Sequence, residues 1–533
     1  MTSFKLAGLK KRNMPVELWR RTLRICCAAL TFAAAAVAQT PTVTSVYNTY
    51  SYSTTLCPGL LAIVVGTNFG TNAANATVTV GGKPAYVYAA NFSAIAMAVE
   101  IPMELSPGAS TLTVTIAGTQ SSPFNVTLAA VSPAFVVPNS VASGLAAVYS
   151  AAGTLITYAA PAHPGDTLST YAIGLGVTTP ATATGTAAAA NPVLPTPTVT
   201  VGGVAAKVSF AGASPGLIAL YQVNFTVPST GVQGTEPLVI TVGGVSSSSA
   251  VEVALAGLSA VAVNGSFANQ GTIAPGSIAS VFANGLGSAS TNQVSGVFPA
   301  VQSEGVEVTF NGEGAPIFHL IPTATPQQID LFVPSDLPTS GTVNVQLTTS
   351  SSDYANYTLN MVPASPSMFR FTDSKTSDQF AIAQFANTAW VVLPVAATAD
   401  IGLPACTATT SAATECGQPA NIGDTLVIYL TGLGLATPNG NPTGTPLPTG
   451  QNPPVSGSPL YETPTLPTVT IGGVPAKVLF SGLTPGYAGE YQIDVTIPAG
   501  VASGDSVPVV VTMLGASDTA NISIQPGRVS PPQ

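Results

Sequence analysis

One short motif in the sequence has the form of a catalytic nucleophile. Residues 212–216 read GASPG, which fits the G-x-S-x-G turn that carries the nucleophilic serine of many hydrolases. Ser214 is followed by Pro215, which has no N–H group to donate to an oxyanion. The matching segment at 482–486 reads GLTPG and has Thr484 in the serine's place. We interpret both segments as β-turns, which leaves an extracellular hydrolase as the third and least favoured function.

The two histidines, His163 and His319, offer little for catalysis. They do not occupy matching positions of the repeats described below, and neither lies in a metal-binding spacing such as H-E-x-x-H. A serine triad or a zinc site needs an imidazole beside a nucleophile or beside further ligands. We therefore predict no catalytic residue, no cofactor and no enzymatic activity.

Carboxylates at matching positions leave calcium as an alternative. Asp166 and Asp424 each follow a turn glycine, and Asp330 and Asp494 occupy one position of a repeated strand. Calcium binds carboxylate and carbonyl oxygens in extracellular proteins. No D-x-D-x-D-G loop is present, and an aspartate in a turn commonly caps its own backbone. We predict no metal-ligating residue, with Ca²⁺ as the alternative.

Tyrosines supply the candidate ligand contacts. Tyr47, Tyr50 and Tyr52 cluster near residue 50, and Tyr86 and Tyr88 share one face of a predicted strand. Carbohydrate-binding surfaces need exposed aromatic rings, whereas tyrosine is also an ordinary strand residue that packs against its neighbours. Both interpretations stay open.

Three cysteines follow the N-terminal segment. Cys406 and Cys416 bracket a loop rich in Thr and Ala, and we predict that they close it as a disulfide in an oxidising compartment. Cys57 is the odd cysteine, and it is interpreted as a buried thiol or as an intermolecular link.

A strand that recurs four times must position these residues. It reads IAMAVEIP at 95–102, YQVNFTVP at 221–228, QQIDLFVP at 327–334 and YQIDVTIP at 491–498. Apolar and polar residues alternate along it, which predicts a half-buried strand of an antiparallel sheet. The closing proline has no N–H for the sheet and ends the strand.

A second repeat has constant spacing and marks four copies of one unit. A glycine at 59, 165, 276 or 423 is followed eleven residues later by a glycine at 70, 176, 287 or 434. Each unit continues with further short strands and a glycine turn, which is typical of an immunoglobulin-like β-sandwich. The turn is Gly-Gly at 81–82, 202–203 and 472–473 and Asn-Gly at 311–312. We name the units modules 1 to 4, and they are predicted at 39–128, 129–256, 257–362 and 363–526, with a tail at 527–533.

Modules 2 and 4 have features that modules 1 and 3 lack. Each begins with an extra hairpin, at 146–158 and 381–393, so the chain is a duplicated pair of modules. Each also contains a long segment rich in Pro, Gly, Thr and Asn, at 177–197 and 435–467. Loops of this length are either functional or flexible insertions, and we favour the flexible insertion.

Residues 1–38 differ from the rest of the chain. Seven Lys and Arg residues precede or flank an apolar run at 25–38 that ends in an A-x-A sequence. This pattern predicts a Sec-type signal peptide, with translation starting at Met1 or Met14. We expect export to the extracellular space, the cell surface or the periplasm.

Charge and hydropathy exclude several partners. Residues 1–38 contain seven of the 13 basic and one of the 22 acidic residues, so the remainder has 6 basic and 21 acidic residues and a net charge of −15. Such a surface is a poor partner for nucleic acid or for anionic membranes. We also expect no membrane span after residue 38, because no later stretch has about 20 consecutive apolar residues.

Several segments resemble a known family. They are GTIAPGSIASVFANGLG (271–287), TPQQIDLFVP (325–334), ASPSMF (364–369) and PTVTIGGVPAKVLFSGLTPGYAGEYQIDVTIPAG (467–500). They look like the uncharacterised C-terminal domain of acidobacterial secreted proteins of the Solibacter type, related to IPT/TIG immunoglobulin-like modules, here in two tandem copies. The resemblance is strong over 257–526, nearly as strong over 129–255, and looser in module 1.

The resemblance implies an all-β chain of tandem immunoglobulin-like modules, and it implies no catalytic residue because the family has no established activity. We expect a non-enzymatic bacterial protein of the cell surface or the medium, with a structural, adhesive or ligand-binding role. The ligand would be an extracellular polymer, a carbohydrate or a protein. An array of carbohydrate-binding modules is the alternative.

Overall fold

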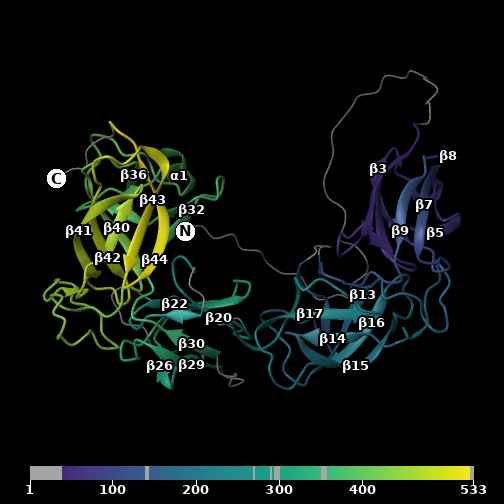
Figure 1. Cartoon of the computed structure of the whole chain (residues 1–533), viewed down its shortest axis with the longest axis horizontal. Coiled ribbons are helices and arrows are strands. Elements are labelled where there is room, and N and C mark those ends of the chain that lie inside the picture. The colour runs from purple at the N-terminus through teal and green to yellow at the C-terminus, as the bar shows by residue number, and fades with distance from the viewer. Residues whose placement is uncertain are drawn as a thin grey trace, which may run out of the picture. The chain divides into compact units, whose positions relative to one another are not determined.

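The structure is a computed structural model that describes residues 39–138, 143–267, 271–287, 291–292, 300–349 and 357–527. The predicted signal peptide, residues 1–38, lies outside the described residues. The described chain is built of strands arranged in β-sandwiches, which confirms the predicted all-β, immunoglobulin-like fold (Figure 1). The helices named in these ranges are short, α1 (Val395–Asp400) and the 3₁₀ turn η1 (Ala73–Asn75). None in the described part of the chain has the length and apolar character that a membrane-spanning helix needs.

Module 1 is a sandwich whose two layers share one long strand. Its strand order is β1-β3-β6-β5-β4-β7-β9-β2, with β8 paired to β7. Strand β5 pairs with β6 in one layer and with β4 in the other, and its register shifts between Val87 and Phe92. The strands are β1 (Thr42–Asn48), β2 (Thr55–Leu56), β3 (Leu61–Thr67), β4 (Ala76–Val80), β5 (Lys83–Phe92), β6 (Ala96–Glu100), β7 (Gly108–Ile116), β8 (Thr119–Gln120) and β9 (Phe124–Leu128).

Module 2 repeats this path with the order β10-β13-β16-β15-β14-β17-β19-β11. Strand β15 bends between the layers, with a register shift between Val208 and Phe210. The extra hairpin adds β12 to the edge of β13. The strands are β10 (Ala134–Phe135), β11 (Gly144–Leu145), β12 (Val148–Ser150), β13 (Thr167–Ile173), β14 (Thr198–Val201), β15 (Val204–Ala213), β16 (Tyr221–Thr226), β17 (Thr235–Val242), β18 (Val245–Ser246) and β19 (Val251–Ala254).

Module 3 has two separate sheets, β20-β22-β28-β27-β23 and β21-β30-β29-β25-β24. The strand that bends between layers elsewhere is here divided into β26 and β27, on either side of Pro316, which has no N–H for the ladder. The strands are β20 (Gly257–Val263), β21 (Thr272–Ile273), β22 (Ile278–Asn284), β23 (Thr291–Asn292), β24 (Gln302–Ser303), β25 (Val306–Phe310), β26 (Glu313–Gly314), β27 (Ile317–Ile321), β28 (Gln327–Phe332), β29 (Gly341–Thr348) and β30 (Tyr357–Met361).

Module 4 has the longest path, β32-β33-β44-β43-β40-β41-β42-β37-β34-β35-β36. Its extra hairpin lies beside β37 and is followed by α1 and β36. The strands are β31 (Ser367–Met368), β32 (Arg370–Thr372), β33 (Gln379–Ala381), β34 (Ala383–Phe385), β35 (Trp390–Val392), β36 (Cys416–Gln418), β37 (Thr425–Thr431), β38 (Thr437–Pro438), β39 (Tyr461–Glu462), β40 (Thr468–Ile471), β41 (Val474–Leu483), β42 (Tyr491–Thr496), β43 (Gly504–Met513) and β44 (Ala516–Ile524).

The repeated strand contributes one row of side chains to the core of each module. Along β16 and β42 buried residues alternate with half-buried ones, as the period of two predicts. Phe225 and Val495 are fully buried in this row, and burying each such side chain contributes about 1.5–3 kcal/mol. The opposite face of the same strands is polar and lies at the surface of the sandwich.

The two long segments are packed, contrary to the flexible insertion that we favoured. In module 2 the segment is tied by bridges of Thr178 to Val193 and of Pro192 to Gly212. In module 4 it forms β38 and β39, which pair with each other, and β39 pairs with β41. Backbone hydrogen bonds to neighbouring strands hold these loops, because a buried N–H or C=O must find a partner.

Candidate ligand-binding face

The outer face of the repeated strand has the same polar pair in three modules. The side-chain amide of Gln222 donates to Oδ1 of Asn224 at 2.8 Å, and Gln492 donates to Asp494 at 3.1 Å. The third pair is Gln328 and Asp330, 2.7 Å apart. In each case the two residues are separated by one buried residue, so both point to the outer face.

Aromatic side chains flank each pair because of the strand register. Opposite the glutamine on the preceding sheet strand is Tyr171, Phe282 or Tyr429. Opposite the Asn or Asp on the other side is Phe210, His319 or Phe480. We call this row of ring, glutamine, Asn or Asp, and ring the Gln-Asx face of modules 2, 3 and 4.

In module 3 the polar groups of the face bond to one another. Asp330 accepts hydrogen bonds from Ser280 at 2.6 Å, from Gln328 at 2.7 Å and from Asn264 at 3.1 Å. His319 Nδ1 lies 3.5 Å from the same carboxylate. The carboxylate thus has several partners within the module, which leaves this copy least suited to a ligand.

This cluster contains Ser, His and Asp but lacks the order of a catalytic triad. The Ser280 hydroxyl donates to Asp330 and not to His319, whereas a triad needs the imidazole between nucleophile and carboxylate. The other histidine, His163, has Nδ1 3.7 Å from Asp166 and is half exposed. Ser214 of the GASPG segment is buried in a turn, where its carbonyl accepts from the N–H of Leu217.

The Gln-Asx faces of modules 2 and 4 have fewer hydrogen bonds among their own side chains than that of module 3, and they are half-exposed. Tyr171 packs edge-on against Tyr149, with ring centroids 6.0 Å apart. In module 4 burial raises the pKa of Tyr429, and the neighbouring carboxylates of Glu490 and Asp494 raise it further. Tyr429 is therefore a neutral phenol at physiological pH, able both to donate and to accept hydrogen bonds.

Module 4 has a concavity at one end of this face. Its volume is about 440 Å³, within the range of small-molecule sites. Its lining contains no charged side chain. It is lined by Gln384, Phe385, Asn387, Thr388, Ala389, Ala412, Ala413, Val427 and Tyr429. The Tyr429 hydroxyl donates to Oε1 of Gln384 at 3.1 Å.

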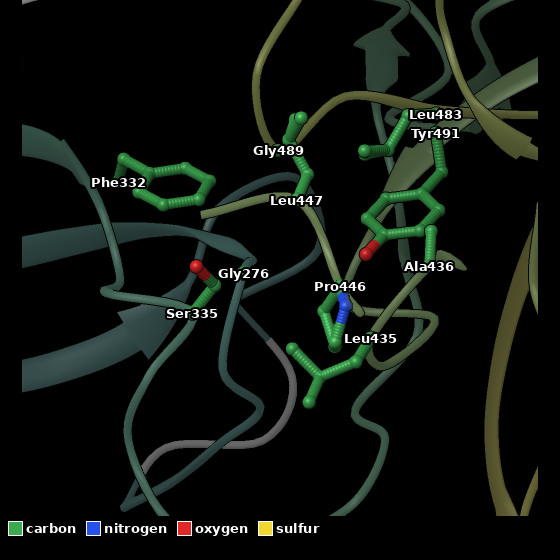
Figure 2. Close-up of a pocket in the computed structure, with 10 residues that line it drawn as sticks. All are labelled: Gly276, Phe332, Ser335, Leu435, Ala436, Pro446, Leu447, Leu483, Gly489 and Tyr491. Atoms are coloured by element: carbon green, nitrogen blue, oxygen red, sulfur yellow. The ribbon is translucent and has the colours of Figure 1, made fainter. Parts of the chain in front are cut away.

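A second cavity is too small for a ligand. Figure 2 shows Tyr491 and Leu447 of module 4 near Phe332 and Ser335 of module 3, around a space of about 10 Å³. Such a volume holds at most about one water molecule. This place is a packed junction between modules.

The long loops make these junctions in the same way in both pairs of modules. The backbone N–H of Met103 donates to Oγ1 of Thr184 at 2.8 Å, and that of Ser335 donates to Oγ1 of Thr449 at 2.9 Å. Met103 and Ser335 each follow the proline that closes the repeated strand. The segment 177–197 therefore joins module 2 to module 1, and the segment 435–467 joins module 4 to module 3.

The tyrosines considered as ligand contacts lie in different surroundings. Tyr86 and Tyr88 pack edge-on with centroids 5.0 Å apart, and the Tyr88 hydroxyl donates to the carbonyl of Ile218 in module 2 at 2.8 Å. They belong to the junction of modules 1 and 2. Tyr47 and Tyr52 form a pair with centroids 5.6 Å apart, whereas Tyr50 packs against the core.

The acidic turn residues cap their own backbone. Oδ2 of Asp166 accepts from the N–H of His163 at 2.8 Å, and Oδ2 of Asp424 accepts from the N–H of Asn421 at 2.7 Å. In the described ranges no group of three or more His, Cys, Asp or Glu side chains lies close enough to hold a metal ion. Each of these carboxylates is therefore engaged by the backbone of its own turn.

Cys406 and Cys416 form a disulfide with their Cα atoms 5.0 Å apart. Cys57 is a free thiol inside module 1, and its Sγ lies 3.7 Å from the carbonyl of Gly174 in module 2. Burial raises the pKa of Cys57 to about 12. The thiol is thus neither exposed nor ionised at neutral pH, unlike a cysteine available for an intermolecular link.

The Gln-Asx face was not predicted as a site. In the sequence Asp330 and Asp494 stand out only as candidates for calcium, and the glutamine of the repeated strand is simply one residue of its polar side. The sequence contains one signal for the face: Q-x-[ND] recurs at the same place in three copies of the repeated strand. Its aromatic flanks come from other strands and needed the sheet register.

Comparison with known proteins finds distant similarities among solved structures. No protein-family model and no curated protein matches the chain. The extracellular region of plexin A4 is 12% identical over 92% of this chain, with a TM-score of 0.23, and the chain spans 31% of that protein. The eight N-terminal immunoglobulin domains of DSCAM are 10% identical over 91% of this chain and 48% of theirs, with a TM-score of 0.17.

A bacterial protein is also similar. SGBP-B of the Bacteroides ovatus mixed-linkage glucan utilization locus, in complex with a mixed-linkage heptasaccharide, is 15% identical over 54% of this chain and 61% of its own, with a TM-score of 0.14. At these levels the similarities concern the fold alone.

Proposed function

We propose that the chain is an exported, non-enzymatic protein that binds carbohydrate through the Gln-Asx faces of modules 2 and 4. The observation that supports this most is the repeated row of two aromatic rings around a hydrogen-bonded Gln and Asn or Asp. Aromatic rings pack against the C–H faces of sugars, and amide and carboxylate groups bond to hydroxyls in pairs. The adhesion or ligand-binding role expected from the sequence then has a defined surface.

The surroundings of the faces favour a sugar over other ligands. The rings of Tyr171 and Tyr429 are half-buried, so their orientation is held by the sheet before a ligand arrives. Each face is a polar surface interrupted by rings and not a continuous apolar patch of the kind that binds another protein core. The net charge of −15 after residue 38 disfavours nucleic acid as a ligand.

Retardation of the chain in native gels that contain a soluble polysaccharide tests the proposal. The gels contain mixed-linkage β-glucan, arabinoxylan, galactomannan or polygalacturonate. We expect retardation by at least one neutral polymer and its loss in the double variant Gln222→Ala, Gln492→Ala. Gln346→Ala, on a half-buried polar position of β29, is the matched control. Unretarded migration in all four polymers would sink the proposal.

We also propose that residues 1–38 are a signal peptide and that the modules belong to the Solibacter-type family with its IPT/TIG relationship. The basic segment, the apolar run and the A-x-A sequence support export, and the repeated motifs support the family. Expression in a Gram-negative host followed by N-terminal sequencing of the periplasmic fraction should give Gln39 as the first residue. An uncleaved cytoplasmic chain would refute the export.

A further inference from the structure

Modules 2 and 4 differ in the length of the segment that connects the extra hairpin to the sheet strand beside it. In module 2, 11 residues (156–166) connect the hairpin partner Leu155 to β13. In module 4, 32 residues (393–424) connect β35 to β37, and they include α1, β36 and the disulfide. This insertion lies at the edge of the sheet that carries the Gln-Asx face.

The tip of the insertion is held at a definite place. The indole N–H of Trp390 donates to the carbonyl of Ser411 at 2.9 Å, and the N–H of Ala389 donates to the carbonyl of Ala412 at 2.7 Å. Trp390 pairs with Cys416 in parallel strands, and Cys416 is bonded to Cys406. The tip is thereby fixed beside the turn of the hairpin before any ligand arrives.

Together the hairpin turn and this tip make the wall of the 440 Å³ concavity. Tyr429 and Val427 of β37 contribute to its lining from the sheet, and Gln384, Asn387 and Thr388 contribute polar groups. The sheet order β41-β42-β37-β34-β35-β36 makes the face continuous from Asp494 through Val427 to Gln384, with Tyr429 beside Val427 on the same strand face and opposite Gln492. In module 2 the residue in the place of Gln384 is Tyr149, and no insertion follows it.

We propose that this concavity is a pocket-type subsite for the end of a neutral oligosaccharide, whose preceding sugars lie along Gln492 and Asp494. The proposal rests on the proposed function. A ligand chain that follows the face from β42 meets the wall at β34 and β35, so the pocket takes a chain end. The corresponding face of module 2 has no wall and binds only the side of a chain.

The groups in the pocket define the class of sugar. The bond from the Tyr429 hydroxyl to Gln384 uses the acceptor of that amide, and it leaves the amide N–H groups and the phenol oxygen for sugar hydroxyls. No cation lines the pocket, and Glu490 and Asp494 lie close enough to Tyr429 to raise its pKa. A uronic acid or a sulfated sugar would therefore meet only negative charge, whereas a neutral hexose or pentose meets a ring and amides.

The test compares the two faces in the full chain by calorimetric titration. The probes are hexasaccharides of the neutral polymer that retards the chain in the native gels. Tyr429→Ala should weaken binding of the hexasaccharide about tenfold or more, as expected for removal of an aromatic anchor, and Gln384→Ala by a smaller factor. Tyr171→Ala in module 2 should weaken it by less than about threefold. Val455→Ala, an 81% exposed position of module 4 outside the concavity, is the control.

The outcomes separate the two proposals. Equal losses of affinity for the hexasaccharide in Tyr429→Ala and Tyr171→Ala would refute the pocket-type subsite but not carbohydrate binding by the faces. Tighter binding of polygalacturonate fragments, or of a protein from the medium, would refute the assignment of a neutral oligosaccharide as the ligand. Failure of every variant and of the wild type to bind any oligosaccharide would refute the proposed function itself. If Tyr429→Ala does not fold, judged by its thermal unfolding, Gln384→Ala decides.

Discussion

The backbone N–H of Gly185 in module 2 donates a hydrogen bond of 2.6 Å to the carboxylate of Glu100 in module 1. Glu100 is 1% exposed and lies two residues before the proline that closes the repeated strand. At the same position of module 3 the residue is Phe332, which lines the junction with module 4. The same junction is thus built twice, once around an ionisable group and once around a phenyl ring.

This difference predicts a pH-dependent stability of the first junction. Burial, together with Glu104, raises the pKa of Glu100 to about 7, although the Gly185 bond opposes the shift, and the ordinary value is 4.5. Because the folded state binds the proton of Glu100 more tightly than the unfolded state does, protonation stabilises the folded state. This stabilisation is fully present below about pH 4.5 and is lost as the pH rises through about 7. The loss amounts to about 3 kcal/mol at most.

Thermal unfolding of the full chain at pH 5 and pH 8 measures this effect. The transition that includes module 1 should occur at a lower temperature at pH 8, and Glu100→Gln should remove most of the difference. Glu104 does not confuse the result, because the Thr184 hydroxyl bond lowers its pKa and it stays ionised over this range. An unchanged pH dependence in Glu100→Gln would show that other groups are responsible.

The threonine contacts of the two long loops predict a loss of stability on substitution. Thr184→Val and Thr449→Val each remove the acceptor of a backbone N–H, which costs about 1–3 kcal/mol when the N–H stays buried. Thr184→Val should cost more, since the Thr184 hydroxyl also donates to Glu104 at 2.6 Å. Calorimetric unfolding measures both, with the exposed strand residue Thr77→Val as control. Equal values for all three variants would contradict the role of the loops at the junctions.

The buried tyrosines of the repeated strand predict a second stability effect. The hydroxyl of Tyr491 donates to the carbonyl of Gly434, and that of Tyr221 donates to the carbonyl of Gly176. Tyr491→Phe keeps the ring and leaves a buried carbonyl without its partner, at a cost of about 1–3 kcal/mol in the free energy of unfolding. Urea titration of Tyr491→Phe and Tyr221→Phe checks this against Tyr357→Phe, which is partly exposed. A cost as small in the two variants as in the control would refute it.

The insertion of module 4 predicts a local response to loss of the disulfide. Replacing Cys406 and Cys416 by Ser together removes a covalent constraint on a short loop, for which chain entropy accounts for about 3 kcal/mol. Trp390 is the only tryptophan after residue 38, and its indole bonds to the loop at Ser411. We expect a shift of its fluorescence to longer wavelength in the chain without residues 1–38. An unchanged spectrum would show that the loop is held without the disulfide.

The sequence alone determined the strands and their repetition. The alternation along 221–228 and 491–498 and the spaced glycines are local patterns, because whether a strand residue faces the core depends on its own position in a period of two. They predicted four sandwiches, and the buried rows of β16 and β42 agree. The prolines that end the repeated strand were predicted for the same local reason.

The tertiary structure decided where chemistry could occur. Tyr429 lies opposite Gln492 only through the pairing of β37 with β42, which are about 60 residues apart in the chain. The wall near Ala412 and the junction bond of Glu100 likewise depend on loops whose path no local pattern encodes. Tyr88 belongs to a junction for the same reason. Side-chain alternation therefore determined which residues face outward, and strand register and loop packing determined which of those residues meet.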